Sequence, residues 1–550
     1  MCYQKTTIYL TATNSSSILS FYSSISDETN QTNITKPKKA FIKHDYSLPN
    51  NYYRTSIQLE DQVYSDDPKD MNLLLLEECL SLKSDSTDIF QCIKKLSSEE
   101  VEVWKDNLGP IYPEFKSAHS LTCLWGSFCI AFVIYGTMNG CLSSLQHALT
   151  KFHEAETLNL VFVLYFTLSF ALMPLCECFF DKFHILSAES IPIGSLIFAS
   201  GLLVLSLKCY ETTGLFIAIS GLMALGTSIL ASPAMSSAGS WFNVHLGKAQ
   251  SSITVGGGIG AIVMPYIFTS IENKSGISNA CFFLFLLCTF FLTMAIFFVK
   301  DNYKYLIEQE LTKREAILIQ QNDNKNYYSD NKKATSLQKA IIKVKNILQK
   351  YGLTQVSFIL VMLSAAIAEN CIGFLQLNIE TILSFTGVKE ANIKNYYAIM
   401  NTSGVIGRLA FGIFADYLIS ANILQSVALI TSVLVTTFLW IPNLLNSGTI
   451  LIIVLLIQGV IFNGIYSITA LCISKVSKKE DFAKRFSLLY MIESFACFPI
   501  FQFLAHQLKN SLVLSFKTVN IFLIIAAVLS ILVQLSHSIE QSINKNKNKK

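Results

Sequence analysis

Charge is scarce in this chain of 550 residues: Asp, Glu, Lys and Arg make up 15% of it, against about a quarter of a typical soluble protein. A soluble chain of this length would fold as several domains, each with a charged surface. Hydrophobic residues make up 51%, so we expect lipid to surround most of the chain. A net charge of +4 is too small to drive binding to phosphates, which excludes nucleic acid as a partner.

Other features are missing as well. The first residues lack the charged start and long apolar core of a signal peptide, so we expect none. The 14 cysteines give no disulfide framework, because most of them, such as Cys123 and Cys281, lie inside apolar runs, where a thiol packs as a small hydrophobe. No Ser, His and Asp set and no Cys and His set converges. The sequence therefore predicts neither an enzyme nor a cofactor or metal site.

What the chain does contain is a series of apolar stretches, each long enough for a helix to cross ~30 Å of hydrocarbon. Runs this long and continuous favour helices over barrel strands, which alternate over about ten residues. We expect twelve helices at residues 120–141, 157–179, 189–207, 213–235, 248–271, 278–299, 355–378, 395–415, 421–441, 449–472, 486–507 and 516–536.

Polar segments divide these helices into two sets of six. The expected organisation is an all-α membrane protein with two six-helix halves. Its segments are a mostly disordered tail (1–118) with one short helix near 71–82, an N-terminal half (119–299), a central loop (300–354), a C-terminal half (355–536) and a basic tail (537–550). Residues 1–118 carry 12 Lys or Arg against 17 Asp or Glu, a net charge of −5, which is typical of a disordered segment. A regulatory role for this tail is the alternative.

The distribution of basic residues predicts the orientation. Loops on the side of the N-terminus and the C-terminal tail hold 22 Lys or Arg, whereas the loops on the other side hold seven. Both termini are therefore expected in the cytoplasm, and we expect the plasma membrane rather than the vacuolar membrane. The sequons at Asn14, Asn30 and Asn33 would then stay unglycosylated.

The 6 + 6 division around a basic loop resembles the major facilitator superfamily, whose halves rock about a site at the membrane midplane. Asp181, Lys182 and Phe183, after the second helix, resemble the superfamily's loop motif, and the run from Gly412 to Asp416 resembles its counterpart in the second half. The resemblance implies that Asp181, Lys182 and Asp416 take part in closing the inner gate.

Two further stretches are similar to the monocarboxylate-transporter-like branch, particularly its fungal members. One runs from Trp241 and Phe242 through Gly256–Gly260 to Pro265, and the other runs from Asn401 to Arg408. Together with the loop motifs, the resemblance covers about residues 118–536. It implies a membrane carrier with a proton-coupled carboxylate substrate.

The chain departs from that branch at several positions. Val244 and His245 stand where the branch has basic residues. Asn139 stands at the position of a lysine in helix one of the animal members, and Gly404 stands where their eighth helix has an aspartate implicated in carrying the proton. The small Gly-Pro-Pro cluster of helix eleven appears as Cys497, Phe498 and Pro499.

Ionisable groups at bilayer depth are costly, so each is a candidate site residue. Arg408 in helix eight has a planar, permanently charged guanidinium that can hold a carboxylate through two hydrogen bonds. Its alternative role is to close the inner gate by pairing with Asp416 or with a helix C-terminus. Asn401 lies seven residues earlier, two turns away on nearly the same face, so both can line one cavity. Asn139 and Asn463 either face that cavity or bond between helices.

Two carboxylates accompany these groups. Glu369 in helix seven is a plausible proton carrier that replaces the missing aspartate, either by pairing with Arg408 and exchanging partners with it or by titrating alone. Its alternative role is that of a protonated, hydrogen-bonded structural residue. Glu493 in helix eleven is expected in a gating network with Lys182, Lys484 or Arg485.

The sequence thus predicts a monomeric secondary active transporter, a symporter of protons and a small, carboxylate-bearing organic solute that works by alternating access. One alternative keeps this scaffold but carries a riboflavin-type vitamin or another non-monocarboxylate solute. The other is a nutrient sensor that transports nothing and signals through its N-terminal tail.

Overall fold

The structure is a computed structural model that describes residues 8–10, 40–44, 55–59, 101, 111–183, 185–327, 351–379, 382–383, 388, 390–438, 448–477 and 481–547. The chain splits into two compact units. One consists of Met1–Gly109 with Ile307–Lys332, and the other of Pro110–Leu306 with Lys333–Lys550. The second unit holds the apolar helices and the candidate site.

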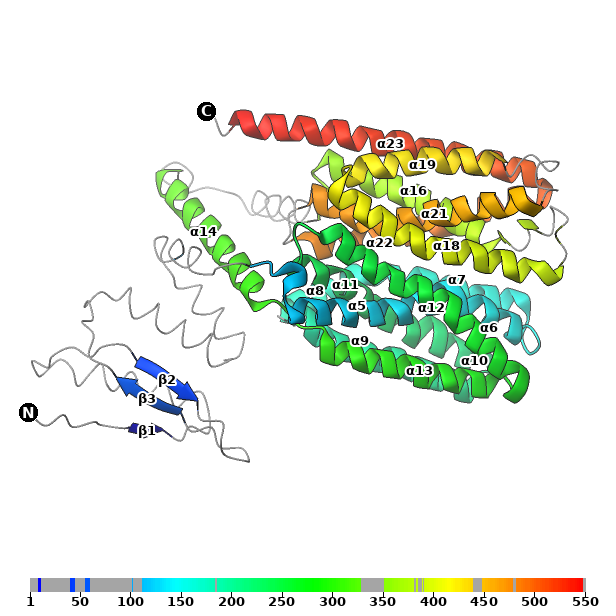
Figure 1. The fold of residues 1–550 in the computed structure, drawn as a ribbon, viewed down its shortest axis with the longest axis horizontal. Helices are drawn as coiled ribbons and strands as arrows, with labels where there is room; N and C mark the ends of the chain where they lie inside the picture. Colours follow the sequence, from blue (N-terminus) through cyan, green and yellow to red (C-terminus); the bar gives the residue numbers. More distant parts are fainter. Residues whose placement is uncertain are drawn as a thin grey trace, which may run out of the picture. The chain divides into compact units, whose positions relative to one another are not determined.

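The first unit contains a small antiparallel sheet of β1 (Ile8–Leu10), β2 (Ala40–His44) and β3 (Thr55–Leu59), in the order β1-β3-β2 (Figure 1). Ile57 of the central strand pairs with Ile8 on one side and with Ile42 on the other. The sequence analysis does not predict this sheet, because strands of three to five residues are at the limit of any readable alternation. The short helix expected over 71–82 lies outside the described residues.

In the N-terminal half, the residues that the structure describes form six apolar helical segments, two of which contain a stretch of π-helix. Their elements are α5 (Ala118–Gly136), η3 (Thr137–Cys141) and α6 (Leu142–Leu149); α7 (Ala155–Ala171) and α8 (Met173–Phe183); α9 (Ser187–Lys208); α10 (Thr212–Leu215), η4 (Phe216–Met223) and α11 (Ala224–Trp241); α12 (Leu246–Ser275); and α13 (Ile277–Phe298).

In the C-terminal half, the described residues form six helices, α16 (Val356–Leu377), α18 (Glu390–Tyr417), α19 (Ala421–Phe438), α21 (Gly448–Val476), α22 (Phe482–Asn510) and α23 (Leu512–Lys547). Within the described residues, eleven helices are long and apolar enough to cross a membrane, and Ala421–Thr437 is a shorter apolar helix. The predicted all-α membrane fold is therefore confirmed for the unit that holds these helices.

The polar stretch between the halves contains a helix that the sequence analysis does not predict, α14 (Tyr303–Tyr327). Glu, Gln, Lys, Leu and Ile dominate its sequence, and most of them have good helix propensity. It shows no apolar stripe, so its polarity alone suggested a loop.

The buried core shows where the two halves meet. We call the end of the bundle at which α5, α9, α12 and α16 begin the loop end, and the opposite end the far end. One cluster of buried apolar residues joins the N-terminal half to the loop-end parts of α16, α21 and α22, including Phe358, Cys472 and Phe486. A separate cluster fills the middle and far end of the C-terminal half. The halves are thus packed together at the loop end.

Small residues let α12 cross α5 closely. A Cβ added at Gly260 would clash with the backbone of Phe132 and Gly136, and one added at Gly256 would clash with Phe128. Gly256 and Gly260 therefore serve close helix packing within the N-terminal half, as small residues do at helix interfaces in membranes. Gly258, between them, faces Val405 and Arg408 of α18 in the other half.

Candidate functional site

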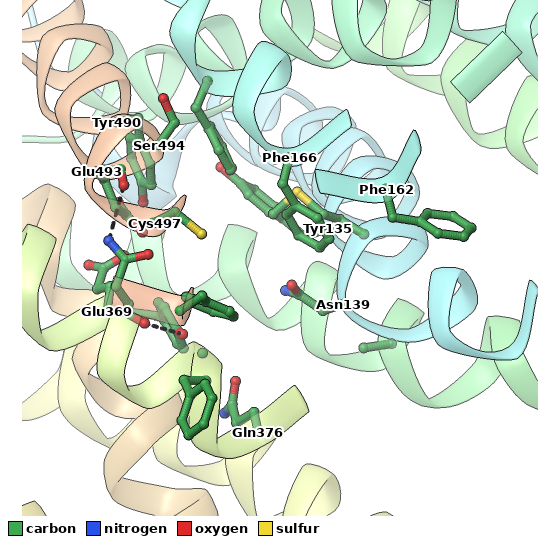
Figure 2. A pocket seen from close by; sticks show the side chains of 18 of the residues that line it. Tyr135, Asn139, Phe162, Phe166, Glu369, Gln376, Tyr490, Glu493, Ser494 and Cys497 are labelled. Carbon is green, nitrogen blue, oxygen red and sulfur yellow. Dashed lines mark hydrogen bonds between the residues drawn. The ribbon is translucent and has the colours of Figure 1, made fainter. Parts of the chain in front are cut away.

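A cavity of about 490 Å³ lies between the two halves (Figure 2). Its walls come mainly from α5, η3, α7 and α12 on one side and from α16, α18, α21 and α22 on the other. Aromatic rings form much of the lining, namely Tyr135, Phe162, Phe166, Phe170, Phe374, Tyr466, Tyr490 and Phe501. Amide side chains form much of the rest, namely Asn139, Gln146, Asn370, Gln376, Asn378, Asn401, Asn463 and Gln502.

The cavity extends towards the far end and is closed towards the loop end. Gln146 and Asn378, which lie at the far ends of α6 and α16, belong to its lining. Towards the loop end, the rings of Phe170 in α7 and Tyr490 in α22 stack with their centroids 5.1 Å apart. This stack joins the two halves, so it closes the cavity on the side of the loop end.

Arg408 lies in the cavity wall on α18, with 6% of its surface exposed. Its Nη2 donates to Asn463 Oδ1 at 2.8 Å, its Nε reaches the same oxygen at 3.3 Å, and its Nη1 donates to the backbone carbonyl of Thr254. Asn463 belongs to the same half, whereas Thr254 belongs to α12 of the other half. Among the described residues, no carboxylate lies within ion-pair distance of this guanidinium.

Asn463 explains how the structure accommodates a glycine at position 404, where animal members of the branch that the sequence resembles have an aspartate. A Cβ at Gly404 would collide with the side-chain amide of Asn463, which reaches across from α21. Asn463 thus fills the space that a side chain at 404 would need and supplies an uncharged oxygen to Arg408. The guanidinium keeps its charge with neutral hydrogen-bond partners only.

Glu369 of α16 is 2% exposed and also lines the cavity. The Thr469 hydroxyl donates to its Oε1, while its Oε2 has no hydrogen-bond partner among the described residues. The predicted ion pair between Glu369 and Arg408 is not formed in this structure, because Arg408 bonds to Asn463 and Thr254.

Glu493 of α22 lies in the cavity wall as well (Figure 2). The sequence predicts that it pairs with Lys182, Lys484 or Arg485 in a gating network. Instead, Lys484 bonds to Asp181, and Arg485 bonds to Gln355 and to the backbone of Val476. Six of the predicted residues therefore share one cavity, and they are Arg408, Asn401, Asn139, Asn463, Glu369 and Glu493.

The remaining predicted residues lie at the loop end. Asp416 accepts hydrogen bonds from the backbone of Gly247 and Lys248, at the start of α12. Asp181 of α8 pairs with Lys484 of α22 at 2.5 Å. Both contacts join the two halves, so they hold the loop end shut. Lys182 is exposed, and its ammonium lies 5.8 Å from the centroid of the Phe183 ring.

The aromatic pair that resembles the fungal branch has a local role at this end. Trp241 Nε1 donates to the carbonyl of Lys300 at 3.0 Å, and Asn302 Nδ2 donates to Ser240 at 2.8 Å. Asp301 Oδ2 accepts from the backbone of Ala188 at 3.1 Å. Burial raises the pKa of Asp301 to about 6 against the effect of that hydrogen bond, and nearby Glu189 contributes to the rise. These contacts fix the segment after α13 to the N-terminal half.

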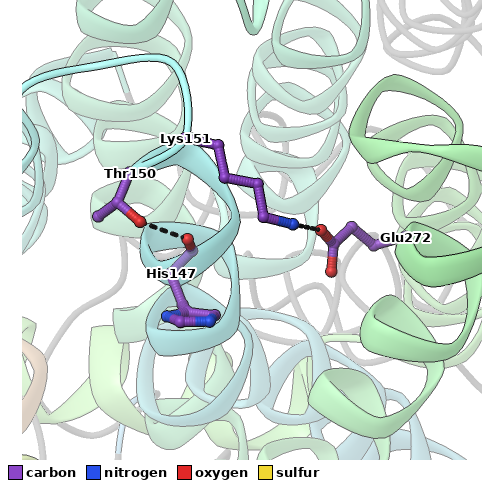
Figure 3. Close-up of polar contacts among 4 residues, drawn as sticks. All are labelled: His147, Thr150, Lys151 and Glu272. Atoms are coloured by element: carbon purple, nitrogen blue, oxygen red, sulfur yellow. Dashed lines mark hydrogen bonds and ion pairs between the residues drawn. The ribbon is translucent and has the colours of Figure 1, made fainter.

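The far end contains an ion pair of a different kind. Lys151 Nζ lies 2.7 Å from Glu272 Oε1, near the end of α12 (Figure 3). Both residues belong to the N-terminal half, so this contact does not join the halves. Among the described residues, no three His, Cys, Asp or Glu side chains gather as metal ligands.

Sequence reasoning missed several groups that complete the site. Thr469, the carbonyl of Thr254 and the aromatic walls carry no signal in a hydrophobic run, since Thr and Phe are ordinary residues there. The Asp181 and Lys484 pair links residues 303 positions apart, and its only sequence signal is that both lie in loop-end segments.

Comparisons with known proteins agree with this architecture. The family model of the Major Facilitator Superfamily matches residues 127–501. The riboflavin transporter MCH5 of Saccharomyces cerevisiae is 22% identical over 284 residues, which are 49% of this chain and 49% of that protein. The MFS transporter asaE of Aspergillus flavus is 22% identical over 374 residues, which are 67% of this chain and 75% of that protein. The chain thus spans about half the length of the first relative.

Two solved structures share the fold. A bacterial homologue of the iron transporter ferroportin, in an outward-facing state, matches with a TM-score of 0.54 at 12% identity, over 76% of this chain and 99% of that one. The proton:xylose symporter XylE matches with a TM-score of 0.56 at 13% identity, over 76% of this chain and 94% of that one. At these identities the likeness concerns the fold.

Proposed function

The chain belongs to the Major Facilitator Superfamily, and on that premise we propose that it is a secondary active transporter of a small, carboxylate-bearing organic solute. Members of this family are multi-pass membrane transporters and not enzymes. Alternating access follows from the two halves, with the solute held in the cavity between them. The excess of Lys and Arg at the loop end supports a cytoplasmic position for both termini, and we propose the plasma membrane as its location.

The observation that carries the proposal is the charge on Arg408. A buried guanidinium has lost its hydration, and the two groups that bind it here, an amide oxygen and a backbone carbonyl, leave its charge uncompensated. A buried charge with neutral partners only is costly, and a partner of opposite sign lowers that cost. A carboxylate on the solute supplies that partner, and the planar guanidinium can hold it through two hydrogen bonds.

The solute is expected to be larger than a three-carbon acid. A cavity of about 490 Å³ falls in the range that takes drug-sized ligands, and a three-carbon acid would leave most of it to water. Asn401 and Asn139 supply hydrogen-bonding groups beyond the carboxylate. The motifs around Trp241 and Arg408 support membership of the monocarboxylate-transporter-like branch. Asn139 and Gly404 replace two charged residues of that branch, which supports a different carboxylate as the substrate.

A proton gradient is the proposed drive. Glu369 is the proton carrier, because it lines the same cavity, is buried, and has one carboxylate oxygen without a partner. With the loop end shut, solute and proton enter from the far end. The two halves then rock, and the contacts of Asp416 and Asp181 break. Solute and proton leave together at the loop end, which makes the transport a symport.

The test is uptake into membrane vesicles with an imposed pH gradient, measured for a panel of carboxylates. We expect accumulation of at least one carboxylate, and we expect R408A to lower its uptake at least tenfold. R408K, which keeps the charge but not the planar fork, should keep part of the affinity. Wild-type uptake in R408A would remove the central element of the proposal.

A second solute class is favoured by the lining itself. Eight aromatic rings and eight amides surround the cavity; rings stack on planar heterocycles, and amides both donate to and accept from their edges. The riboflavin transporter among the relatives points to the same class. Competition of uptake by flavins against small carboxylates separates the two, since a heterocycle carrier would be inhibited by flavins and would tolerate R408A.

A further inference from the structure

Two carboxylates, not one, face the cavity from adjoining helices. Glu369 lies on α16 and Glu493 on α22, and both line the cavity (Figure 2). The Oε2 atom of each is buried and has no hydrogen-bond partner among the described residues. Buried polar atoms almost always have partners, so two orphaned carboxylate oxygens on one wall need an explanation.

The backbone holds these two residues close together. Asn370, next to Glu369, donates through Nδ2 to the backbone carbonyl of Glu493 at 3.0 Å. The same amide donates to Ala366 at 2.8 Å, which fixes its orientation. The two carboxylates are near enough to interact electrostatically. Asn370 is thus a positioning residue that sets the distance between α16 and α22.

No cation described in the structure neutralises this pair. Arg408 is bonded to Asn463 and Thr254, and Lys484 is bonded to Asp181. Arg485 bonds to Gln355 and to the backbone of Val476 at the loop end. The other titratable groups that face the pair are uncharged at neutral pH, and they are Tyr135 of α5, Tyr466 and Cys472 of α21, and Tyr490 and Cys497 of α22.

We propose that Glu369 and Glu493 share one proton and together carry the coupling proton of transport. Two adjacent carboxylates that each have a buried oxygen resist being charged together, because their repulsion adds to the cost of burying each charge. The shared proton is therefore a property of the pair rather than of either residue. It forms an O–H bond with a carboxylate oxygen when the far end is open, and it passes to water when the loop end is open.

This inference rests on the proposed proton-driven transport and adds to it. It moves the coupling function from Glu369 alone to a pair of carboxylates that does not involve Arg408. Solute charge and coupling proton then occupy separate parts of one cavity, with Arg408 serving the solute and the acidic pair serving the proton.

The experiment compares E369Q, E493Q and the double variant in vesicles, with uptake measured against external pH. Removal of Glu493 takes away the like charge, so Glu369 should hold the proton less tightly. We expect the pH of half-maximal uptake to fall by about one unit in E493Q. The double variant should lose accumulation driven by the pH gradient. All three should still exchange solute across the membrane without a gradient, which shows that they fold.

E540Q is the matched control, because Glu540 of α23 accepts from Ser357 outside the cavity. Its pH profile should equal that of the wild type. An unchanged pH profile and unchanged accumulation in E493Q would overturn the inference while leaving the proposed function intact. Uptake driven by a Na⁺ gradient and lost in E369Q would overturn the assignment to a proton. A wild type that accumulates no carboxylate would instead refute the proposed function.

Discussion

Asp416, near the end of α18, caps the start of α12 through the backbone of Gly247: one carboxylate oxygen accepts from Gly247 N at 2.7 Å and the other from Lys248 N at 2.8 Å. The two helices belong to different halves. A helix N-terminus carries unsatisfied N–H groups and a partial positive charge, so a carboxylate is a favourable partner there. The contact therefore ties the halves through a charge and a helix end rather than through two side chains.

D416A should loosen this tie. An anion at a helix N-terminus contributes about 0.3–2 kcal/mol, so we expect the population of the conformation open at the loop end to rise by about twofold to 30-fold. Cys497 lines the cavity and can report it, since a maleimide applied from the loop end should label it faster. The C497A variant shows which part of the labelling comes from Cys497. D416N keeps one acceptor oxygen, so its labelling rate should lie between those of D416A and the wild type. Equal labelling rates in D416A and wild type would contradict the latch.

The pair of Asp181 and Lys484 allows a charge-swap test. Asp181 is 51% exposed and Lys484 16%, and an exposed pair contributes about 0.2–1 kcal/mol. D181K should lower uptake about twofold to fivefold, because it sets two cations against each other, and D181K/K484D should recover it. Swapping Lys151 and Glu272, which lie in one half, is the control and should leave uptake unchanged. Failure of the double swap to recover would argue against a direct ionic contact.

The crowding at Gly404 gives a steric prediction. G404D should misfold or express poorly, because its side chain collides with Asn463. G404D/N463G opens that space and allows the new carboxylate to reach Arg408. We expect the double variant to recover expression, measured by size-exclusion chromatography in detergent, but to lose carboxylate uptake, since Arg408 is now neutralised within the protein. Recovered uptake in the double variant would mean that the charge of Arg408 does not bind the solute.

Asp301 makes thermal stability depend on pH. Its pKa in the folded protein is about 6, above the value of about 3.9 in an unfolded chain. Between these values the folded state binds more protons, so its stability is full below about pH 4 and falls as the pH rises through 6. D301N keeps an oxygen for Ala188 and removes the titration. We expect the drop in Tm between pH 5 and pH 7.5 to be smaller in D301N by about 1–3 °C.

The measurement is thermal unfolding of purified protein in detergent over that pH range. D181N is a control for the loss of a loop-end carboxylate, because the side chain of Asp181 is 51% exposed. The drop in Tm of this variant over the pH range should match that of the wild type. A Tm profile for D301N that parallels the wild type would contradict the buried state of Asp301.

Much of the fold follows from the sequence because hydrocarbon thickness dictates the length of each apolar run. The helix ends are less predictable, since polar residues continue a helix beyond the lipid: α18 begins at Glu390 rather than at 395, and α23 continues to Lys547. The helix α14 was missed because it has no apolar face, and helix propensity alone is weak information.

For the site, the sequence identifies the ionisable residues, because a charge at bilayer depth is costly. Their partners could not be inferred. Arg408 and Thr254 are separated by 154 positions, and their contact depends on how α12 packs against α18. Likewise, the place of Glu493 beside Glu369 follows from the packing of α16 against α22, which no local pattern encodes.

The stacked rings of Phe170 and Tyr490 carry a kinetic consequence. To release its solute at the loop end, the carrier must separate these two rings and the buried apolar residues around them that join the halves. Water then contacts apolar surfaces that were buried. Wetting hydrocarbon raises the heat capacity. The turnover rate should therefore follow a curved Eyring plot, and smaller side chains at the two ring positions should straighten it.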